Sequence, residues 1–400
     1  MNKPAKRKQR RIRWGRLLVP LFVCAGLIVL ALPHPSDKET TSEPETETES
    51  PDTVQITATG DVLLEEPILN YFGSGDWKGY MDALAPYFEQ DDLTIANQEV
   101  PIGGEEMGIE GIDYRFNAPT ATAANLKAAG IDFVSLANNH AMDRGFEGIQ
   151  KTHANLDAAG IGHTGTWTEE GQQDGITIQE VNGLRLAIVS YTYGCNLPAD
   201  PAWSVNVFGS WQDEAGVQQL LEDVTKARET ADAVIVCMHW GTEFTYELDE
   251  DQTQLAGQIA QAGADVIIGN HPHCIQPAQW IETTDGRQVL CFYSLGNLVS
   301  SAYEVSRADE QFQDMYEVGA LGQFTLTKEG QGVTVSDARI IPVVNHFEND
   351  YQDFQLIPLK NYTEDMAARH DQARYSNLFT AAWLQEQTAQ VFSDPSIPIE

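Results

Sequence analysis

Two histidines separated by a single proline are the residues of this chain best suited to chemistry. His271 and His273 stand in the sequence GNHPH (269–273), directly after the apolar run 264–268. On extended backbone, side chains two positions apart project to the same side, so we expect both imidazoles to face one metal ion. A lone loop histidine is more often satisfied by backbone groups and water, so the pair gains weight only if other segments supply further ligands.

Polar side chains follow several other apolar, strand-like runs. The runs are 54–59, 93–96, 132–137, 233–238 and 264–268. In open α/β sheets, ligands bind outside the carboxyl ends of the strands. Carboxylate, amide and imidazole groups suit Mn, Zn or Fe, so the sequence predicts a divalent metal site with one or two ions. The residues at these ends are Asp61, Asn97, Glu99, Asn139, His140, His239, His271, His273 and Asn297.

Helix-like segments alternate with these strands and must position them. They cover 77–88, 119–129, 145–159, 211–230 and 251–262, which favours a largely parallel α/β sheet. Two hairpin signals, Asn182-Gly183 and Asp285-Gly286, predict antiparallel pairs, so we expect one mixed sheet or two packed sheets. The apolar-poor segment 301–317 is expected to be a surface insertion, and 378–391 a closing helix.

The N-terminal region has the pattern of a signal peptide or signal anchor. Eight of the 24 basic residues stand in segment 1–16, and an apolar run follows at 17–32. No Ala-x-Ala site follows Leu32, which favours an uncleaved single-pass anchor helix over a removed peptide. Segment 33–53 is rich in Pro, Ser, Thr and Glu, which predicts a disordered acidic linker. We therefore expect a cell-membrane protein whose domain 54–345 and C-terminal extension 346–400 lie outside the cytoplasm.

The composition limits the classes of partner. The chain has 42% hydrophobic residues over 400 positions, enough for a large core. Beyond Arg16 it carries 16 basic and 59 acidic residues, a net charge of −43, which would repel nucleic acid. No nucleic-acid partner is expected. Export would permit disulfides among Cys195, Cys237, Cys274 and Cys291, although Cys237 and Cys291 stand in apolar runs where buried free thiols are equally expected.

Six ordered motifs resemble the CapA family of capsule and poly-γ-glutamate synthesis proteins, a branch of the calcineurin-like metallophosphatase superfamily. The motifs are GDVL (60–63), NQE (97–99), LANNHAMDRG (136–145), HWGTE (239–243), GNHPH (269–273) and SLGN (294–297). The resemblance covers about 54–344, and six motifs in order are hard to obtain by chance. It implies a metallophosphatase-like, four-layer α/β/β/α sandwich with mixed sheets, preceded by the anchor helix and the disordered linker.

The resemblance also implies roles for single residues. His140 would protonate a leaving group. From its spacing alone, three residues after His140, Asp143 could orient the imidazole or could be only an acidic residue at a helix N-terminus. Glu243 would either support a ligand or be solvated. Metal ions at such a site activate water and neutralise charge on substrate oxygens. The implied ligands are Asp61, Glu99 as the bridging carboxylate, Asn139, His239, His271 and His273.

Two residues are expected to contact substrate. Arg115 lies in a loop, and its guanidinium could grip a carboxylate or phosphate through two parallel hydrogen bonds. A surface salt bridge is the alternative account of Arg115. Asn297 ends the motif SLGN and is expected on the substrate side of the site.

Two departures from the superfamily pattern bear on activity. The superfamily's first motif is Asp-x-His, whereas Asp61 is followed two positions later by Leu63. The superfamily's bridging aspartate is also replaced, by Glu99. Either change could leave one ion weakly held, so a single-ion or less active centre stays open, and the fold alone does not establish phosphatase activity.

The leading functional expectation is a membrane-anchored, exported CapA-like protein with a metal-dependent hydrolase-type site. Its partners would be a polymer synthase complex and an anionic surface polymer or polymer precursor. One alternative is a non-catalytic assembly subunit of that complex, which Leu63 favours. The other is a generic exported metallophosphoesterase.

Overall fold

The structure is a computed structural model that describes residues 52–73, 75, 77, 79–112, 115–301, 310–330 and 332–400. The expected basic segment 1–16, the expected anchor 17–32 and the linker up to residue 51 lie outside the described residues. Within the described ranges, no helix has both the length and the apolar character needed to cross a bilayer.

The first sheet has eight strands within the described residues and is mixed. β1 to β4 run parallel to one another, whereas β12 runs antiparallel to β1, and β11 (Asn297–Val299) pairs with the end of β1. The order is β14 (Gln352–Pro358), β13 (Gly332–Glu348), β12 (Val318–Glu329), β1 (Thr53–Val62), β2 (Leu93–Gln98), β3 (Phe133–Ser135) and β4 (Gly162–Thr164).

In the part of the chain that the structure describes, the second sheet has six strands and is also mixed. Its order is β5 (Thr177–Val181), β6 (Leu184–Thr192), β7 (Ala233–His239), β8 (Val266–Asn270), β10 (Gln288–Leu295) and β9 (Ile275–Glu282). The edge strands β5 and β9 are antiparallel to their neighbours, and both predicted hairpins are confirmed. Asn182 and Gly183 have φ angles of 46° and 83°, the left-handed conformation that a two-residue hairpin turn requires.

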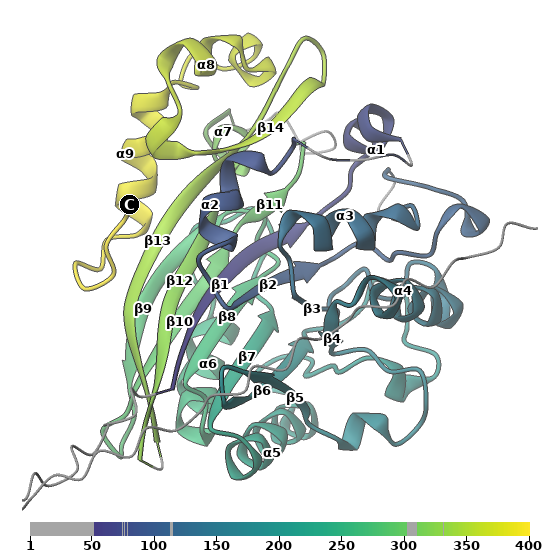
Figure 1. Ribbon diagram of the computed structural model, residues 1–400, viewed down its shortest axis with the longest axis vertical. Coiled ribbons are helices and arrows are strands. Elements are labelled where there is room, and N and C mark those ends of the chain that lie inside the picture. The colour runs from purple at the N-terminus through teal and green to yellow at the C-terminus, as the bar shows by residue number, and fades with distance from the viewer. Residues whose placement is uncertain are drawn as a thin grey trace, which may run out of the picture. The chain divides into compact units, whose positions relative to one another are not determined.

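Side-chain alternation along the strands divides the core into layers. In β7, Ile235 and Cys237 face the core between the two sheets, whereas Val234 and Val236 face the outside of the second sheet. Helices α5 (Glu214–Thr230) and α6 (Glu250–Ala262) cover that outer face. Helices α3 (Ala121–Ala129) and α4 (Gly145–Ala159) cover the outer face of the first sheet (Figure 1). The layers are therefore helix, sheet, sheet and helix, and the expectation of an α/β fold with two mixed sheets is confirmed.

Two sequence-based expectations about local structure were wrong. Within the described residues of segment 77–88, the helical parts are the 3-10 helix η1 (Asp82–Leu84) and α2 (Ala85–Phe88). Trp77 and Tyr80 precede them on irregular backbone, and both side chains are buried. Segment 301–317 is not a surface insertion throughout, since it ends in α7 (Glu310–Tyr316), where Met315 and Tyr316 are buried. The short helix α1 (Glu66–Phe72) was not expected.

The expected boundary at residue 345 lies inside β13, three residues before that strand ends. β14 continues the first sheet beyond that point. The predicted closing helix is α9 (Ala381–Val391), which places Leu384 in the core between the sheets. The other short helices are η2 (Glu105–Met107), η3 (Gln172–Asp174), η4 (Ala202–Ser204), η5 (Leu359–Asn361), α8 (Glu364–Arg369) and η6 (Asp371–Arg374).

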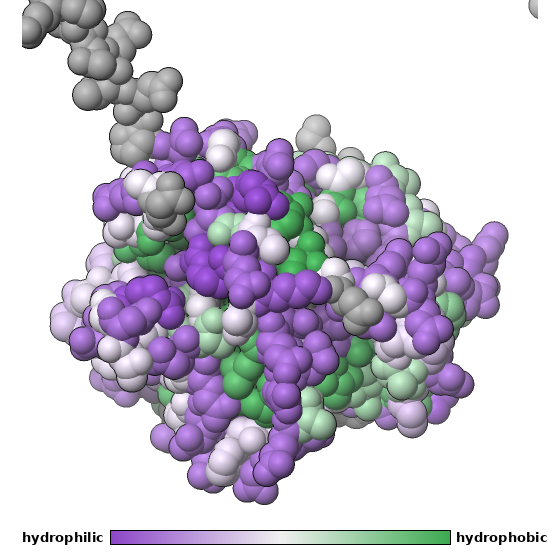
Figure 2. All heavy atoms as spheres, turned by 90° about the horizontal axis from the view of Figure 1, so that it is seen from below, coloured by the Kyte–Doolittle hydropathy of each residue, from purple (hydrophilic) through white to green (hydrophobic). Residues whose placement is uncertain are grey.

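The surface and the cysteines agree with the composition. The face shown in Figure 2 is mostly hydrophilic, and its apolar areas are small and separated. Cys195, Cys237, Cys274 and Cys291 are all free thiols, and all but Cys195 are buried.

Candidate metal centre

Asp61 is presented at the end of β1 by a close backbone contact. The pairing of β1 with β2 shifts register between Ala58 and Asp61. Gly60 makes this possible, because a Cβ at that position would lie 2.0 Å from the carbonyl oxygen of Gly296. The Asp61 backbone N–H donates to the same oxygen at 2.9 Å. The Asp61 carboxylate is fully buried, and its Oδ2 accepts from the His271 backbone N–H at 3.2 Å, so it reaches across to the second sheet.

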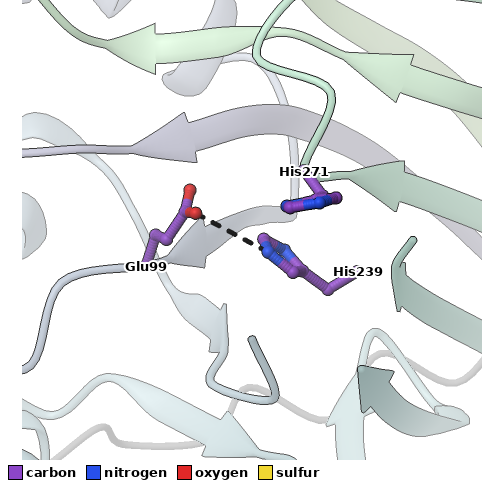
Figure 3. Close-up of side chains that lie close together, drawn as sticks. All are labelled: Glu99, His239 and His271. Carbon is purple, nitrogen blue, oxygen red and sulfur yellow. Dashed lines mark ion pairs between the residues drawn. The ribbon is translucent and has the colours of Figure 1, made fainter. Parts of the chain in front are cut away.

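Glu99 follows β2 directly and is the most isolated buried carboxylate of the centre. Its Oε1 lies 3.6 Å from Nε2 of His239, the contact dashed in Figure 3, and 3.7 Å from Nε2 of His273. Within the described residues, neither Glu99 oxygen accepts a hydrogen bond. Burial, and secondly the charge of Asp61, raise the pKa of Glu99. A buried carboxylate in this state is costly unless a cation lies beside it.

Asn139 and His140 lie in the turn after β3, which Asn138 holds. The Asn138 amide donates to the Gln98 carbonyl at 2.9 Å, and its Oδ1 accepts from the His140 backbone N–H at 3.0 Å. These bonds fasten the turn to the end of β2. The Oδ1 atom of Asn139 lies 2.8 Å from Nε2 of His239, so an amide oxygen meets an imidazole from the other sheet.

His239 ends β7 and is enclosed by the other site residues. Its Nδ1 lies 3.3 Å from the amide nitrogen of Asn97, which also donates to Oδ1 of Asp61 at 2.7 Å. Burial, followed by the neighbouring His271 and His273, lowers the pKa of His239. The neutral imidazole favoured by this environment is the form that binds metals.

The His271–His273 pair is not on extended backbone, as the sequence had led us to expect. β8 ends at Asn270, and the φ angles of His271 and His273 are 103° and 56°. Residues other than glycine are uncommon there, and such strain persists only where the surroundings hold it. Figure 3 shows the His271 and His239 side chains close together, with ring centroids 4.6 Å apart. Nδ1 of His271 is buried and has no hydrogen-bond partner among the described residues.

His273 is oriented by Asn297. Nδ1 of His273 lies 3.1 Å from Oδ1 of Asn297 and 3.4 Å from Oδ2 of Asp61. Burial lowers the pKa of His273, but the charge of Glu99 and the hydrogen bond and charge of Asp61 outweigh this and raise the pKa to about 10. Asn297 is fully buried, and its amide nitrogen donates to the carbonyls of His273 and Tyr316. Asn297 therefore positions His273, and its expected contact with substrate stays a prediction.

The donor set fits a divalent metal centre. Two groups, Glu99-His239-His271 and Asp61-Glu99-His273, each have ligand atoms within 4.8 Å of one another, and Glu99 belongs to both. Ligand atoms about 2.0–2.2 Å from a tetrahedral ion lie roughly 3–3.5 Å apart, close to the distances found here. The unpartnered atoms of Glu99 and His271 are those that an ion would satisfy. A divalent ion held there would supply Lewis-acid chemistry.

His140 and Asp143 form a buried pair beside this centre. Nδ1 of His140 lies 2.7 Å from Oδ2 of Asp143, which also accepts from the Phe116 backbone N–H at 2.8 Å. This bond favours the orienting role of Asp143 over that of an isolated acidic residue before α4. Nε2 of His140 faces the Asn196 amide nitrogen at 3.5 Å and is the ring atom left to exchange a proton.

One predicted site residue lies at the surface, and two residues near the centre were missed. The Arg115 side chain is exposed, and its expected contact with substrate stays a prediction. Sequence reasoning missed Tyr193, whose ring lies 4.7 Å from that of His271, and Asn196, whose backbone N–H donates to the Asn139 carbonyl at 2.7 Å. No motif marks this segment. Its one signal was its place after β6, at the carboxyl end of a parallel strand.

The protein is thus an α/β/β/α sandwich whose strand ends carry a buried carboxylate and imidazole centre. Residues 55–302 match the family model described as "Bacterial capsule synthesis protein PGA_cap". The chain belongs to this family, as its motifs had suggested.

Two relatives from bacilli carry capsule-related names. The chain is 28% identical over 308 residues to "PGA biosynthesis protein CapA" of Bacillus subtilis (strain 168), covering 72% of each protein. It is 28% identical over 258 residues to "Capsule biosynthesis protein CapA" of Bacillus anthracis, covering 61% of this chain and 59% of that protein.

A mycobacterial relative is named for an accessory role. It is "Probable polyglutamine synthesis accessory protein Rv0574c" of Mycobacterium tuberculosis (strain ATCC 25618 / H37Rv), 27% identical over 231 residues. The match covers 56% of this chain and 59% of that protein.

Solved structures with a similar arrangement are more distant in sequence. The calcineurin-like phosphoesterase YfkN from Bacillus subtilis is 16% identical, with a TM-score of 0.44 over 85% of this chain and 98% of that one. A hypothetical protein from Thermus thermophilus is 19% identical, with a TM-score of 0.42 over 72% of this chain and 99% of that one.

Proposed function

We propose that this chain is a membrane-anchored, exported protein of capsule or poly-γ-glutamate biosynthesis. It would use a divalent metal centre to hydrolyse a bond in an anionic surface polymer or its precursor, or to transfer a group from it. Family membership and the names of the relatives support the biosynthetic context. The basic segment and the apolar run 17–32 support the anchor. The observation that carries the site is Glu99, a buried carboxylate that both ligand groups share.

The roles of the side chains follow from the geometry. Asp61, Glu99, Asn139 and the three histidines of the centre would hold the metal, one or two ions of Mn, Zn or Fe. His140, fixed through Nδ1 by Asp143, would deliver a proton from Nε2 to the leaving group. Tyr193 packs beside His271 and would limit access of water on that side.

A non-catalytic assembly subunit of a polymer synthase complex is the second candidate. The observation in its favour is Leu63, which packs in the apolar cluster on the outer face of the first sheet and offers no ligand. In that case the sandwich would act as a scaffold, and the centre would be structural.

Metal content and complementation separate these proposals. The full chain, purified in detergent and dialysed, is expected to retain Mn, Zn or Fe by elemental analysis, and His271→Ala is expected to lose it. In a deletion strain, His140→Ala should fail to restore polymer production although it retains metal. Restored production by His140→Ala would favour the assembly subunit. If elemental analysis finds no bound metal in the wild-type chain, the proposed metal centre is wrong.

A further inference from the structure

Glu243 is a carboxylate near the centre that neither of the two ligand groups includes. Its carboxylate lies in a third group with His271 and His273, in which the ligand atoms are within 4.8 Å of one another. Glu243 is half-buried, and among the described residues its carboxylate makes no hydrogen bond or ion pair. The approach to two imidazoles is therefore not explained by contacts within the protein.

The turn after β7 fixes Glu243 in this place. The next residue, Phe244, has a φ angle of 64°, and its backbone N–H donates to the Pro272 carbonyl at 3.0 Å. This bond ties the turn that carries Glu243 directly to the strained turn that carries His271 and His273. The side chain is thus held beside the centre by backbone geometry on both sides.

Three carboxylates lie close to His273 at this centre. Glu243 adds a third carboxylate to Asp61 and Glu99, and all three belong to ligand groups that include His273. Like charges in a partly buried site repel strongly, whereas a bound divalent ion reverses the sign of the local field. His271 supplies an independent indication, because its buried Nδ1 has no partner among the described residues.

We propose that Glu243 is a metal ligand, which binds an ion of this centre together with His271 and His273. The inference rests on the proposed metal centre and adds a seventh ligand to it, from the turn 240–244. In the Asp61-Glu99-His273 group the protein supplies three metal-binding side chains. Leu63 packs in an apolar cluster and offers no fourth ligand. The Glu243 carboxylate, which lies near His273, would provide that further ligand.

Equilibrium metal binding tests the assignment without recourse to activity. Full-length Glu243→Gln is compared with Glu247→Gln, which removes the same charge from an exposed residue of the same loop. Affinity for Zn²⁺ and Mn²⁺ is measured by competition with a chromophoric chelator, and stoichiometry by elemental analysis. Because a ligand is lost, Glu243→Gln is expected to bind one ion with an affinity at least roughly tenfold lower than that of the wild type. Glu247→Gln should bind metal with the wild-type affinity.

The possible outcomes test the assignment of Glu243 separately from the proposed metal centre. If the wild type binds metal and Glu243→Gln binds it equally well, Glu243 is only a solvated neighbour, and the other ligands stand. If both variants weaken binding alike, the effect is long-range charge and the assignment is wrong. If the wild type binds no metal, the proposed centre itself fails. Glu243→Asp, which retains the charge but shortens the side chain, should show an intermediate loss, and melting curves in chelator verify that each variant is folded.

Discussion

Oε1 of Glu99 lies 3.6 Å from Nε2 of His239, and this contact joins the ends of strands from two different sheets. Both side chains are buried, and burial together with the charge of Asp61 raises the pKa of Glu99, so the ionised carboxylate is disfavoured in the metal-free protein. An ion at the centre would reverse this effect. The same carboxylate therefore has opposite effects on stability with and without metal.

Replacing Glu99 with Gln should separate these two effects. Without metal, Glu99→Gln is expected to raise the free energy of unfolding by about 1–3 kcal/mol, because burial of the carboxylate and its repulsion by Asp61 outweigh its attraction to His273. With Zn²⁺ or Mn²⁺ present, it should lose most of the metal-dependent stabilisation of the wild type. Urea unfolding in chelator and in excess metal measures both, with exposed Glu89→Gln as the control. A variant that is destabilised in both conditions would contradict this account.

Metal removal should lower stability by an amount that depends on the logarithm of the free metal concentration relative to the dissociation constant. A ligand at about 100 times its dissociation constant stabilises the folded state by about 2.7 kcal/mol if it binds only that state. Chelation of the wild type should therefore lower the melting temperature, and re-addition of metal should restore it. His271→Ala should show a much smaller difference between the two conditions. An unchanged melting temperature in chelator would argue against a bound ion.

The His140–Asp143 hydrogen bond should affect turnover rather than metal content. Asp143→Asn leaves His140 without the carboxylate that fixes its orientation, and proton transfer by a positioned side chain is worth about 10²–10⁴-fold. We expect a loss in this range in a screen of phosphodiester substrates with Mn²⁺, with metal content unchanged. Should Asp143→Asn lose metal instead, its role is to support the ligands. Total inactivity of the wild type across the screen would count against a generic phosphoesterase.

Gly60 and Gly257 provide a matched pair of substitutions. In Gly60→Ala the new Cβ would meet the Gly296 carbonyl oxygen at 2.0 Å, so we expect a loss of about 3 kcal/mol or more and a displaced Asp61. Gly257 lies exposed in α6 with nothing within 4 Å of a new Cβ, so Gly257→Ala should stabilise by about 0.5–1 kcal/mol. Chemical unfolding with and without metal checks both. Equal effects at the two positions would contradict the close-contact account of Gly60.

The residues at strand ends could be predicted from the sequence, whereas their exact surroundings could not. Parallel strands place their carboxyl ends at one edge, so Asp61, Glu99 and His239 were predictable from their positions after apolar runs. The strained turn at His271 and His273 was not, because its conformation depends on Asp61 and Phe244, which are distant in sequence. The contact of Asn297 with His273 was not predictable for the same reason.

The buried structure after residue 309 could not be predicted from the composition of that segment. Segment 301–317 has few apolar residues, yet Asp314 is fully buried and satisfied, since Gln372 donates to Oδ1 at 3.1 Å and Ser376 to Oδ2 at 2.5 Å. Both partners come from the C-terminal residues. Polar burial through distant partners leaves no periodic signal, which explains why segment 301–317 was expected to be a surface insertion.

Acid should destabilise the protein partly through His370. Its Nε2 donates to the Asn345 carbonyl at 2.9 Å, and its Nδ1 accepts from the Gln372 backbone N–H at 3.0 Å, so protonation of Nδ1 would break the second bond. Burial lowers the pKa of His370 from 6.5 to about 3. Between these values the unfolded chain binds more protons, so stability falls as pH falls, by about 1.4 kcal/mol per pH unit from this group.

The variant His370→Gln isolates this contribution. It retains a side-chain donor for Asn345 but cannot take up a proton, so its unfolding free energy should fall less steeply than that of the wild type between pH 6 and about pH 4. Above pH 7 the two proteins should show the same pH dependence. Parallel curves over the acidic range as well would assign the acid sensitivity to other groups.

The backbone N–H of His271 donates to Asp61, a residue 210 positions earlier in the chain and in the other sheet. Asp61, Glu99 and Asn139 come from one sheet, and the three histidines from the other, so neither sheet alone offers an ion a complete coordination set. A folding chain must close this long loop and dock the two sheets before it can hold metal tightly. Bound metal should therefore leave the folding rate nearly unchanged and lower the unfolding rate. The metal-bound protein would then have a higher kinetic stability than the metal-free protein.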